Sequence, residues 1–326
     1  MLRRTFFVFG ALTAFGAGRV HAQQRLPSRP WRIGVLTPAE SDATPLFMAF
    51  RQRMQELGYS EGRDVLLDFR LAKGDTRALP RMAEELIAAG VNVIVTDGAG
   101  AAGAAKEATR RVPIVMASSG ADPVALGLVA SMARPGGNIT GLTLIHGTLS
   151  AKRLEILKTV VPTAESFTVL VNPHPGSEVN FRSVEEAARS LGPIKLDRID
   201  IATPEALRAF PPQALAGRPL LVLPDAMFWN QRREIVALVA RAGVPALYPE
   251  REYADEGGLI AYGPNVPDNF RRAADYVDRV LKGANPAELP IQEPTKIDLI
   301  INLRAAKAQG IQIPVPLLGR ADEVIE

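Results

Sequence analysis

The fold is decided by residues 91–120, which read VNVIVTDGAGAAGAAKEATRRVPIVMASSG. Residues 91–95 are almost continuous valine and isoleucine, which is typical of a strand covered on both faces. Residues 99–110 are rich in alanine and predict a helix, and residues 113–116 repeat the strand pattern. A strand, a helix and a second strand in this order indicate a parallel sheet with helices packed against it.

The same alternation continues on both sides of this stretch. Before it, strands are expected at 32–36 and 64–71, and helices at 44–58 and 76–89. After a glycine-rich crossing at 135–141 the alternation restarts, with strands at 167–171, 194–201, 220–223, 245–248, 259–262 and 297–301 and helices at about 150–160, 178–191, 204–215, 228–242, 266–282 and 303–309. The sequence therefore predicts an α/β protein with two Rossmann-like lobes, each built on a parallel sheet.

Open parallel sheets bind ligands beyond the carboxyl ends of their strands, so the loops after the strands are the expected site. In the first lobe the candidate residues are Thr37, Pro38, Asp97, Gly98, Ala99, Ser118, Ser119 and Asp122. In the second lobe they are Asn172, Asp225, Phe228 and Glu250.

The chemistry of these candidates suggests how a ligand would be held. The free N–H groups of a helix that starts near Gly98 and the hydroxyls of Ser118 and Ser119 suit a carboxylate. Glu250 suits an ammonium group, and Phe228 suits an apolar or planar group.

Structural explanations compete with each of these ligand roles. The two serines could cap a following short helix, for which Asp122 and Pro123 would be the N-cap and first residue. Asn172 and Asp225 could be turn residues, Glu250 could pair with Arg251, and Phe228 could pack in a core.

Residues 98–103 also fit the dinucleotide-binding pattern G-x-G-x-x-G, and Asp122 follows the last glycine by 19 residues. The pattern follows the third strand instead of the first, so we interpret it as one wall of a binding site. A nucleotide-using enzyme remains an alternative. The chain has no cysteine and no G-x-S-x-G motif, and His146 and His174 lack metal-ligand spacing, so we expect no catalytic residues, no metal and no cofactor.

The first 22 residues have the layout of a secretory signal peptide. Arg3 and Arg4 precede an uncharged apolar run of about 14 residues, which is short of the roughly 20 needed to span a bilayer. Cleavage is expected after Ala22, by the general or the twin-arginine route, and predicts a periplasmic protein. The remaining chain holds 35 basic and 35 acidic residues, which argues against a nucleic-acid partner.

Several runs resemble the ABC-transporter substrate-binding family that includes tryptophan and tyrosine importers. They are residues 32–36, 57–63, 112–115, 128–141, 257–265, 292–296 and 317–326. The resemblance covers about residues 31–326 and implies a type I periplasmic binding protein whose two lobes are joined by a three-crossing hinge near 141–146, 262–266 and 286–296. It implies lobes of 31–143 plus 264–290 and of 144–263 plus 291–326.

The resemblance also implies function and partners. It implies a monomer that binds a small molecule, such as an amino acid or aromatic compound, and delivers it to an ABC permease in the inner membrane. A ligand-sensing protein that docks on a membrane receptor is an alternative. Relatives often carry small hydroxyl residues where this chain has Asp97 and Glu250, so these two acids are the positions where its ligand could differ.

Overall fold

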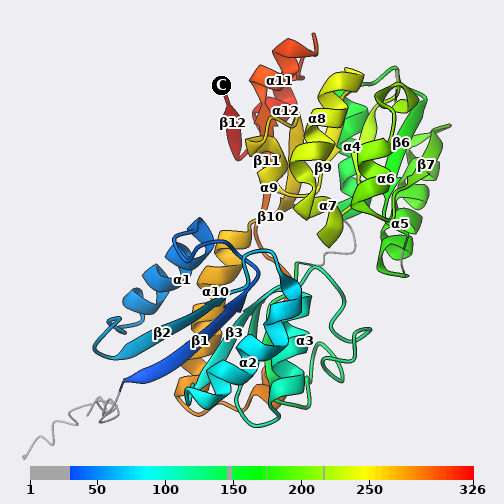
Figure 1. Cartoon of the computed structure of the whole chain (residues 1–326). Coiled ribbons are helices and arrows are strands. Elements are labelled where there is room, and N and C mark those ends of the chain that lie inside the picture. The colour runs from blue at the N-terminus through cyan, green and yellow to red at the C-terminus, as the bar shows by residue number, and fades with distance from the viewer. Residues whose placement is uncertain (1–29, 145–148, 174, 216) are drawn as a thin grey trace, which may run out of the picture.

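The computed structural model describes residues 30–144, 149–173, 175–215 and 217–326 (Figure 1). The predicted signal peptide, His146 and His174 lie outside the described residues. Figure 1 shows two α/β lobes, each with helices packed against a sheet, connected by a narrow junction. The prediction of two Rossmann-like lobes is confirmed.

The first sheet has the order β2-β1-β3-β4-β5, and all of its strand pairs are parallel. Its elements are β1 (Trp31–Thr37), α1 (Pro45–Glu56), β2 (Val65–Leu71), η1 (Thr76–Ala78), α2 (Leu79–Ala88), β3 (Val93–Asp97), α3 (Ala99–Ala108), β4 (Ile114–Ser118) and β5 (Ile139–Gly141). The short strand β5 falls within the stretch expected to be only a glycine-rich crossing.

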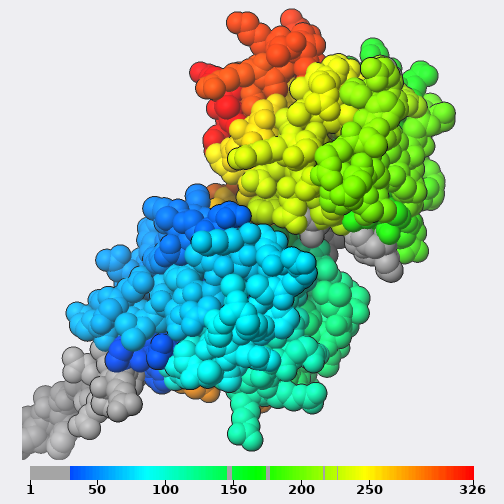
Figure 2. All heavy atoms as spheres, viewed as in Figure 1, coloured from blue at the N-terminus to red at the C-terminus, as the bar shows by residue number. Residues whose placement is uncertain are grey.

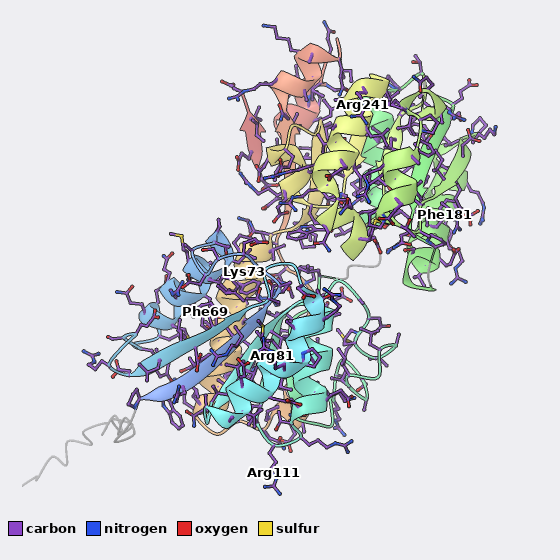
Figure 3. The ribbon with its side chains drawn as sticks, viewed as in Figure 1. Phe69, Lys73, Arg81, Arg111, Phe181 and Arg241 are labelled. Carbon is purple, nitrogen blue, oxygen red and sulfur yellow. The ribbon has the colours of Figure 1, made fainter. Side chains whose placement is uncertain are left out.

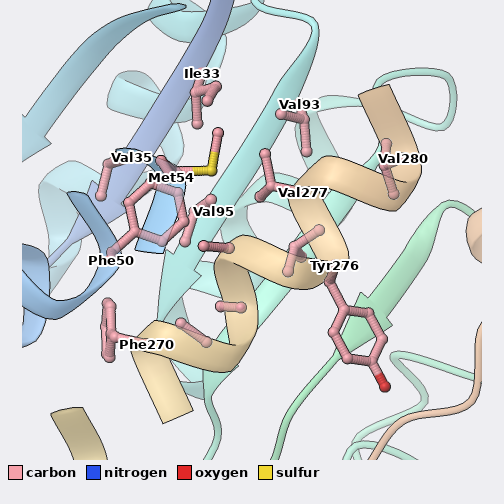
Figure 4. Close-up of a cluster of buried hydrophobic side chains, with 14 of the residues drawn as sticks. Ile33, Val35, Phe50, Met54, Val93, Val95, Phe270, Tyr276, Val277 and Val280 are labelled. Atoms are coloured by element: carbon pink, nitrogen blue, oxygen red, sulfur yellow. The ribbon is translucent and has the colours of Figure 1, made fainter. Parts of the chain in front are cut away.

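A helix from late in the chain completes the core of the first lobe. Helix α10 (Val266–Leu281) packs against α1 and against the face of the sheet formed by β3 and β4 (Figure 4). Phe270 and Val277 of α10 are fully buried together with Val35 and Val95 of the strands. The helix begins where the Asn265 side chain accepts a hydrogen bond from the Asp268 N–H at 2.7 Å. The short helix η3 (Pro286–Glu288) then lies beside β5.

The second sheet has the order β12-β11-β10-β9-β8-β6-β7. Its strands are β6 (Ser166–Val171), β7 (Lys195–Asp200), β8 (Leu220–Val222), β9 (Ala246–Tyr248), β10 (Ile260–Pro264), β11 (Ile297–Asn302) and β12 (Glu323–Ile325). Expecting only parallel strands was wrong for one pair, because β10 and β11 are antiparallel, with Pro264 opposite Ile297. The reason is that β10 leaves this lobe toward α10 while β11 re-enters it from the same side.

The helices of the second lobe agree in part with the sequence patterns, but two of the expected helices are divided. They are α4 (Leu149–Val160), α5 (Pro175–Leu191), α6 (Pro204–Ala209), η2 (Pro212–Leu215), α7 (Ala226–Asn230), α8 (Arg232–Ala242), α9 (Arg251–Asp255), α11 (Leu303–Ala308) and α12 (Val315–Leu318). The expected helix 204–215 divides because Pro211 and Pro212 cannot continue it. The expected helix 228–242 divides at Gln231, which ends α7 and precedes α8.

The carboxyl ends of both sheets point toward the junction. In the first lobe, β5 ends at Gly141 and leads into the second lobe. In the second lobe, β10 ends at Pro264 and leads into α10 of the first. Because the strands β1 to β5 are parallel, as are β6 to β10, their carboxyl ends share these edges. Figure 3 agrees, since Lys73, just after β2, lies at the end of the first lobe nearer the junction and Arg111, just before β4, lies at the far end.

Backbone hydrogen bonds join two of the connecting segments. Residues 142 and 292 form an isolated parallel bridge. Thr143 donates its N–H to the Gln292 carbonyl at 2.9 Å, and Gln292 donates its N–H to the Gly141 carbonyl at 3.0 Å. Helix α10 adds a side-chain contact, because the buried Asn269 donates its amide N–H to the Thr143 carbonyl at 2.9 Å. The connections are therefore held as one bundle at the junction.

Candidate functional site

Asp97 lies at the centre of the first lobe's carboxyl edge. It is the last residue of β3, and its two carboxylate oxygens accept hydrogen bonds from the Thr37 hydroxyl and the Ser118 hydroxyl, each at 2.8 Å. Burial raises the pKa of Asp97, and the two hydroxyl hydrogen bonds oppose that rise. One acid therefore organises the ends of three neighbouring strands, β1, β3 and β4.

The same contacts engage the groups that sequence reasoning assigned to a ligand carboxylate. The Gly98 N–H donates to both the carbonyl and the hydroxyl oxygen of Ser118, each at 3.0 Å. The Ser119 hydroxyl donates to the Ala121 carbonyl at 2.8 Å. Ala99 is the first residue of α3, so its N–H is one of the helix's initial amide groups. Apart from that helix end, the expected carboxylate donors already have protein partners.

The other two first-lobe candidates have structural roles. Thr37 is fully buried and its hydroxyl oxygen also accepts the Ala39 N–H at 3.0 Å, so the intervening Pro38 begins a tight loop. The structural alternative for Asp122, the N-cap of a short helix, is not formed, because residues 123–127 form turns. The exposed Asp122 carboxylate instead accepts the Val124 N–H at 2.8 Å.

Glu250 is the corresponding acid of the second lobe. It follows β9 and precedes α9, and its Oε2 atom is buried without a hydrogen-bond partner in the described part of the chain. Burial raises the pKa of Glu250 to about 8; Arg153 opposes this rise, while Glu252 and Asp225 add to it. The alternative in which Glu250 pairs with Arg251 is not formed, because Arg251 binds Glu323 and Asp255.

Arg153 of α4 is a site residue that sequence reasoning missed. It is 3% exposed, and its guanidinium donates to the Tyr262 carbonyl at 2.8 Å and to the Pro249 carbonyl at 3.2 Å. Burial lowers the pKa of Arg153 to about 10, and the nearby Glu250 opposes the fall. The sequence did contain a sign that Arg153 is buried, because its spacing places it on the same helix face as the buried Leu149 and Leu157.

The remaining second-lobe candidates hold the loop after β8. Asp225 is the N-cap of α7, accepting the Met227 N–H at 2.8 Å and the Phe228 N–H at 3.2 Å. Asn172 donates its amide N–H to the same carboxylate at 3.0 Å, which joins the ends of β6 and β8. Phe228 is fully buried in the core, so the structure gives its ring a packing role instead of the expected ligand contact.

The glycine pattern at 98–103 does not have the surroundings of a dinucleotide site. Gly98 has a φ of 86°, and α3 begins directly after it. The carboxylate of Asp97 precedes this helix start, where a pyrophosphate would have to bind. A negative group there repels a phosphate, which supports reading the pattern as a wall of the strand-end site.

Two surface pockets lie elsewhere on the first lobe. One, of about 520 Å³, is lined by α1, by residues 59–61 and by the start of β2. The other, of about 300 Å³, is lined by Arg110, Arg111 and Asn138 at the opposite end of the sheet from Asp97. Figure 2 shows the two lobes meeting over a narrow waist.

Within the part of the chain that the structure covers, no helix is both long and apolar enough to cross a membrane. The described residues also contain no group of three or more histidine, aspartate or glutamate side chains arranged to hold a metal ion.

Two lobes whose strand ends face a shared junction define the architecture of a type I periplasmic binding protein. The family model for ABC transporter substrate binding proteins matches residues 32–325. The chain therefore belongs to this family of solute-binding proteins, and the resemblance found in the sequence is confirmed.

Individual relatives agree with this assignment. The tyrosine-binding protein of Clostridioides difficile is 26% identical over 266 residues, covering 81% of this chain and 76% of its own. A solved Vibrio cholerae protein described as a conserved domain protein matches with a TM-score of 0.78 and 25% identity over 91% of this chain and all of its own. A Streptococcus pneumonia protein solved with L-Trp has the same fold, with a TM-score of 0.80 and 23% identity over the same shares.

Proposed function

We propose that this protein is the periplasmic component of an ABC importer and captures a small nitrogen-containing solute between its two lobes. The observation that carries this proposal is the buried Oε2 atom of Glu250 at the carboxyl edge of the second sheet, which has no hydrogen-bond partner among the described residues. A buried carboxylate without a hydrogen bond is costly, and a positively charged ligand group would supply the missing partner.

The proposed site combines both strand edges. The first lobe contributes Asp97 and the start of α3, and the second contributes Glu250 with the loop after β8. The lobes would be 31–143 plus 264–290 and 144–263 plus 291–326, and they would close by bending at the three connections between them. The bundle formed by Thr143, Asn269 and Gln292 supports this, because it keeps the connections together while the lobes move.

A thermal-shift screen of the mature protein tests the proposal. The panel contains amino acids, aromatic acids, nucleobases and aliphatic amines, with NAD as the probe of the enzyme alternative. A true solute at 100 times its dissociation constant stabilises the native state by about 2.7 kcal/mol, which corresponds to at least about 4 °C in a chain of this size. A shift with NAD alone, or no shift with any member of the panel, would contradict solute capture.

A further inference from the structure

We propose that the solute is a dication, with one positively charged nitrogen bound by Asp97 of the first lobe and a second bound by Glu250 of the second. This inference rests on the proposed function and specifies the chemical class of its solute. An aliphatic diamine is the simplest member of that class.

The first lobe is prepared to accept hydrogen bonds and to attract positive charge. The Thr37 and Ser118 hydroxyls both direct their protons at Asp97, so neither can donate to a ligand carboxylate at the same time. The Gly98 N–H is also engaged, with Ser118. A carboxylate placed here would lie beside the carboxylate of Asp97 without these donors, whereas an ammonium would be attracted to the Asp97 carboxylate.

The second lobe also favours a positively charged ligand group. Arg153 is the buried cation near Glu250, and its guanidinium donates to two backbone carbonyls, which fixes its position. Glu250 Oε2 has no hydrogen-bond partner among the described residues. Asp225 and Glu252 add negative charge around Glu250, so a ligand ammonium would be attracted to this atom.

Acidic residues outnumber basic residues in the loops that follow the strands. The described loops directly after β1 to β4, β6, β8 and β9 carry two bases, Lys73 and Arg134. Their acids are Glu40, Asp42, Asp75, Asp122, Asp225 and Glu250, in addition to Asp97 at the end of β3. Lys73 is exposed on the first lobe (Figure 3). Asp42 and Asp75 are paired with Arg51 and Arg77, and the remaining acids favour cations over anions at this edge.

Isothermal titration calorimetry with 1,5-diaminopentane, L-tyrosine and L-tryptophan tests the inference. We expect the diamine to bind most tightly to the parent protein. Asp97→Asn and Glu250→Gln should each weaken diamine binding by at least about 30-fold, because each leaves one ammonium without its charged partner. Glu107→Gln is the matched control, since it removes the same charge from an exposed position near the far end of α3 and should leave affinity unchanged.

Three outcomes overturn the inference. One is tight binding of tyrosine or tryptophan that Asp97→Asn leaves unchanged; this would preserve the proposed function with an ordinary zwitterionic solute. Another is diamine affinity that falls equally in the Glu107→Gln control, which would mean non-specific charge attraction. The third is a folded protein that binds none of the three solutes. In that case the proposed function also fails only if no compound of the wider thermal-shift panel stabilises the protein.

Discussion

A Glu250→Gln protein is expected to be more stable than the parent chain at pH 9 while losing affinity for its solute. A glutamate side chain ordinarily has a pKa of 4.5, and burial raises that of Glu250 to about 8. Between these two pH values the folded protein keeps a proton on Glu250 that the unfolded chain releases. The free energy of unfolding of the parent therefore decreases as the pH rises from about 4.5 to about 8.

Glutamine removes this contribution because it cannot ionise. At pH 9 we expect the free energy of unfolding of the Glu250→Gln protein to exceed that of the parent by about 1–4 kcal/mol, and at pH 5 by much less. One pKa unit corresponds to roughly 1.4 kcal/mol. The loss of a negative charge near Arg153 offsets part of this gain. Urea unfolding at both pH values measures the difference, with Glu107→Gln as the control for net charge. If the parent and the Glu250→Gln protein lost stability in parallel over this range, the environment assigned to Glu250 would be wrong.

Gly263→Ala is expected to have the largest effect on the fold. A Cβ atom at Gly263 of β10 would lie 1.7 Å from the Pro249 carbonyl oxygen. That carbonyl accepts a hydrogen bond from Arg153, and the next residue is Glu250. Because the obstacle is backbone, the strand or the loop must move. We expect a loss of at least about 4 kcal/mol or failure of the second lobe to fold, which exceeds ordinary overpacking.

Gly103→Ala provides the matched comparison. A Cβ at Gly103 in α3 meets no atom within 4 Å outside the backbone of its own helix. Alanine in a helix interior should stabilise the protein by about 0.5–1 kcal/mol. Circular dichroism during thermal unfolding distinguishes the two variants. A Gly263→Ala protein as stable as the parent would refute the close approach of β10 to the Pro249 loop.

The sequence predicted those parts of the fold that depend on local pattern. Continuous Val and Ile runs located β3, β4 and β6, and helical spacing located α1 and α10. The carboxyl ends of β3 and of the strand expected at 245–248 then indicated where Asp97 and Glu250 would lie. These predictions succeed because buried parallel strands and amphipathic helices each have a characteristic periodicity.

Features set by contacts between distant segments were not predictable. Strand β12 has only three residues and exists because it pairs with β11. The antiparallel β10–β11 pair depends on the path of the chain through the first lobe. Likewise, no local pattern shows that Thr37 and Ser118, 81 residues apart, donate to the same carboxylate of Asp97. This contact engages hydroxyl donors that were expected to bind a ligand carboxylate, and it is the observation behind the proposed cation binding in the first lobe.

The most direct test of solute capture between the lobes is a crystal structure of the mature protein with its bound solute. We expect solute density between the carboxyl ends of the two sheets, with a nitrogen atom within about 3.2 Å of Glu250 Oε2. Solute bound instead in the pocket between α1 and the start of β2, or held by one lobe without contact to Glu250, would contradict it.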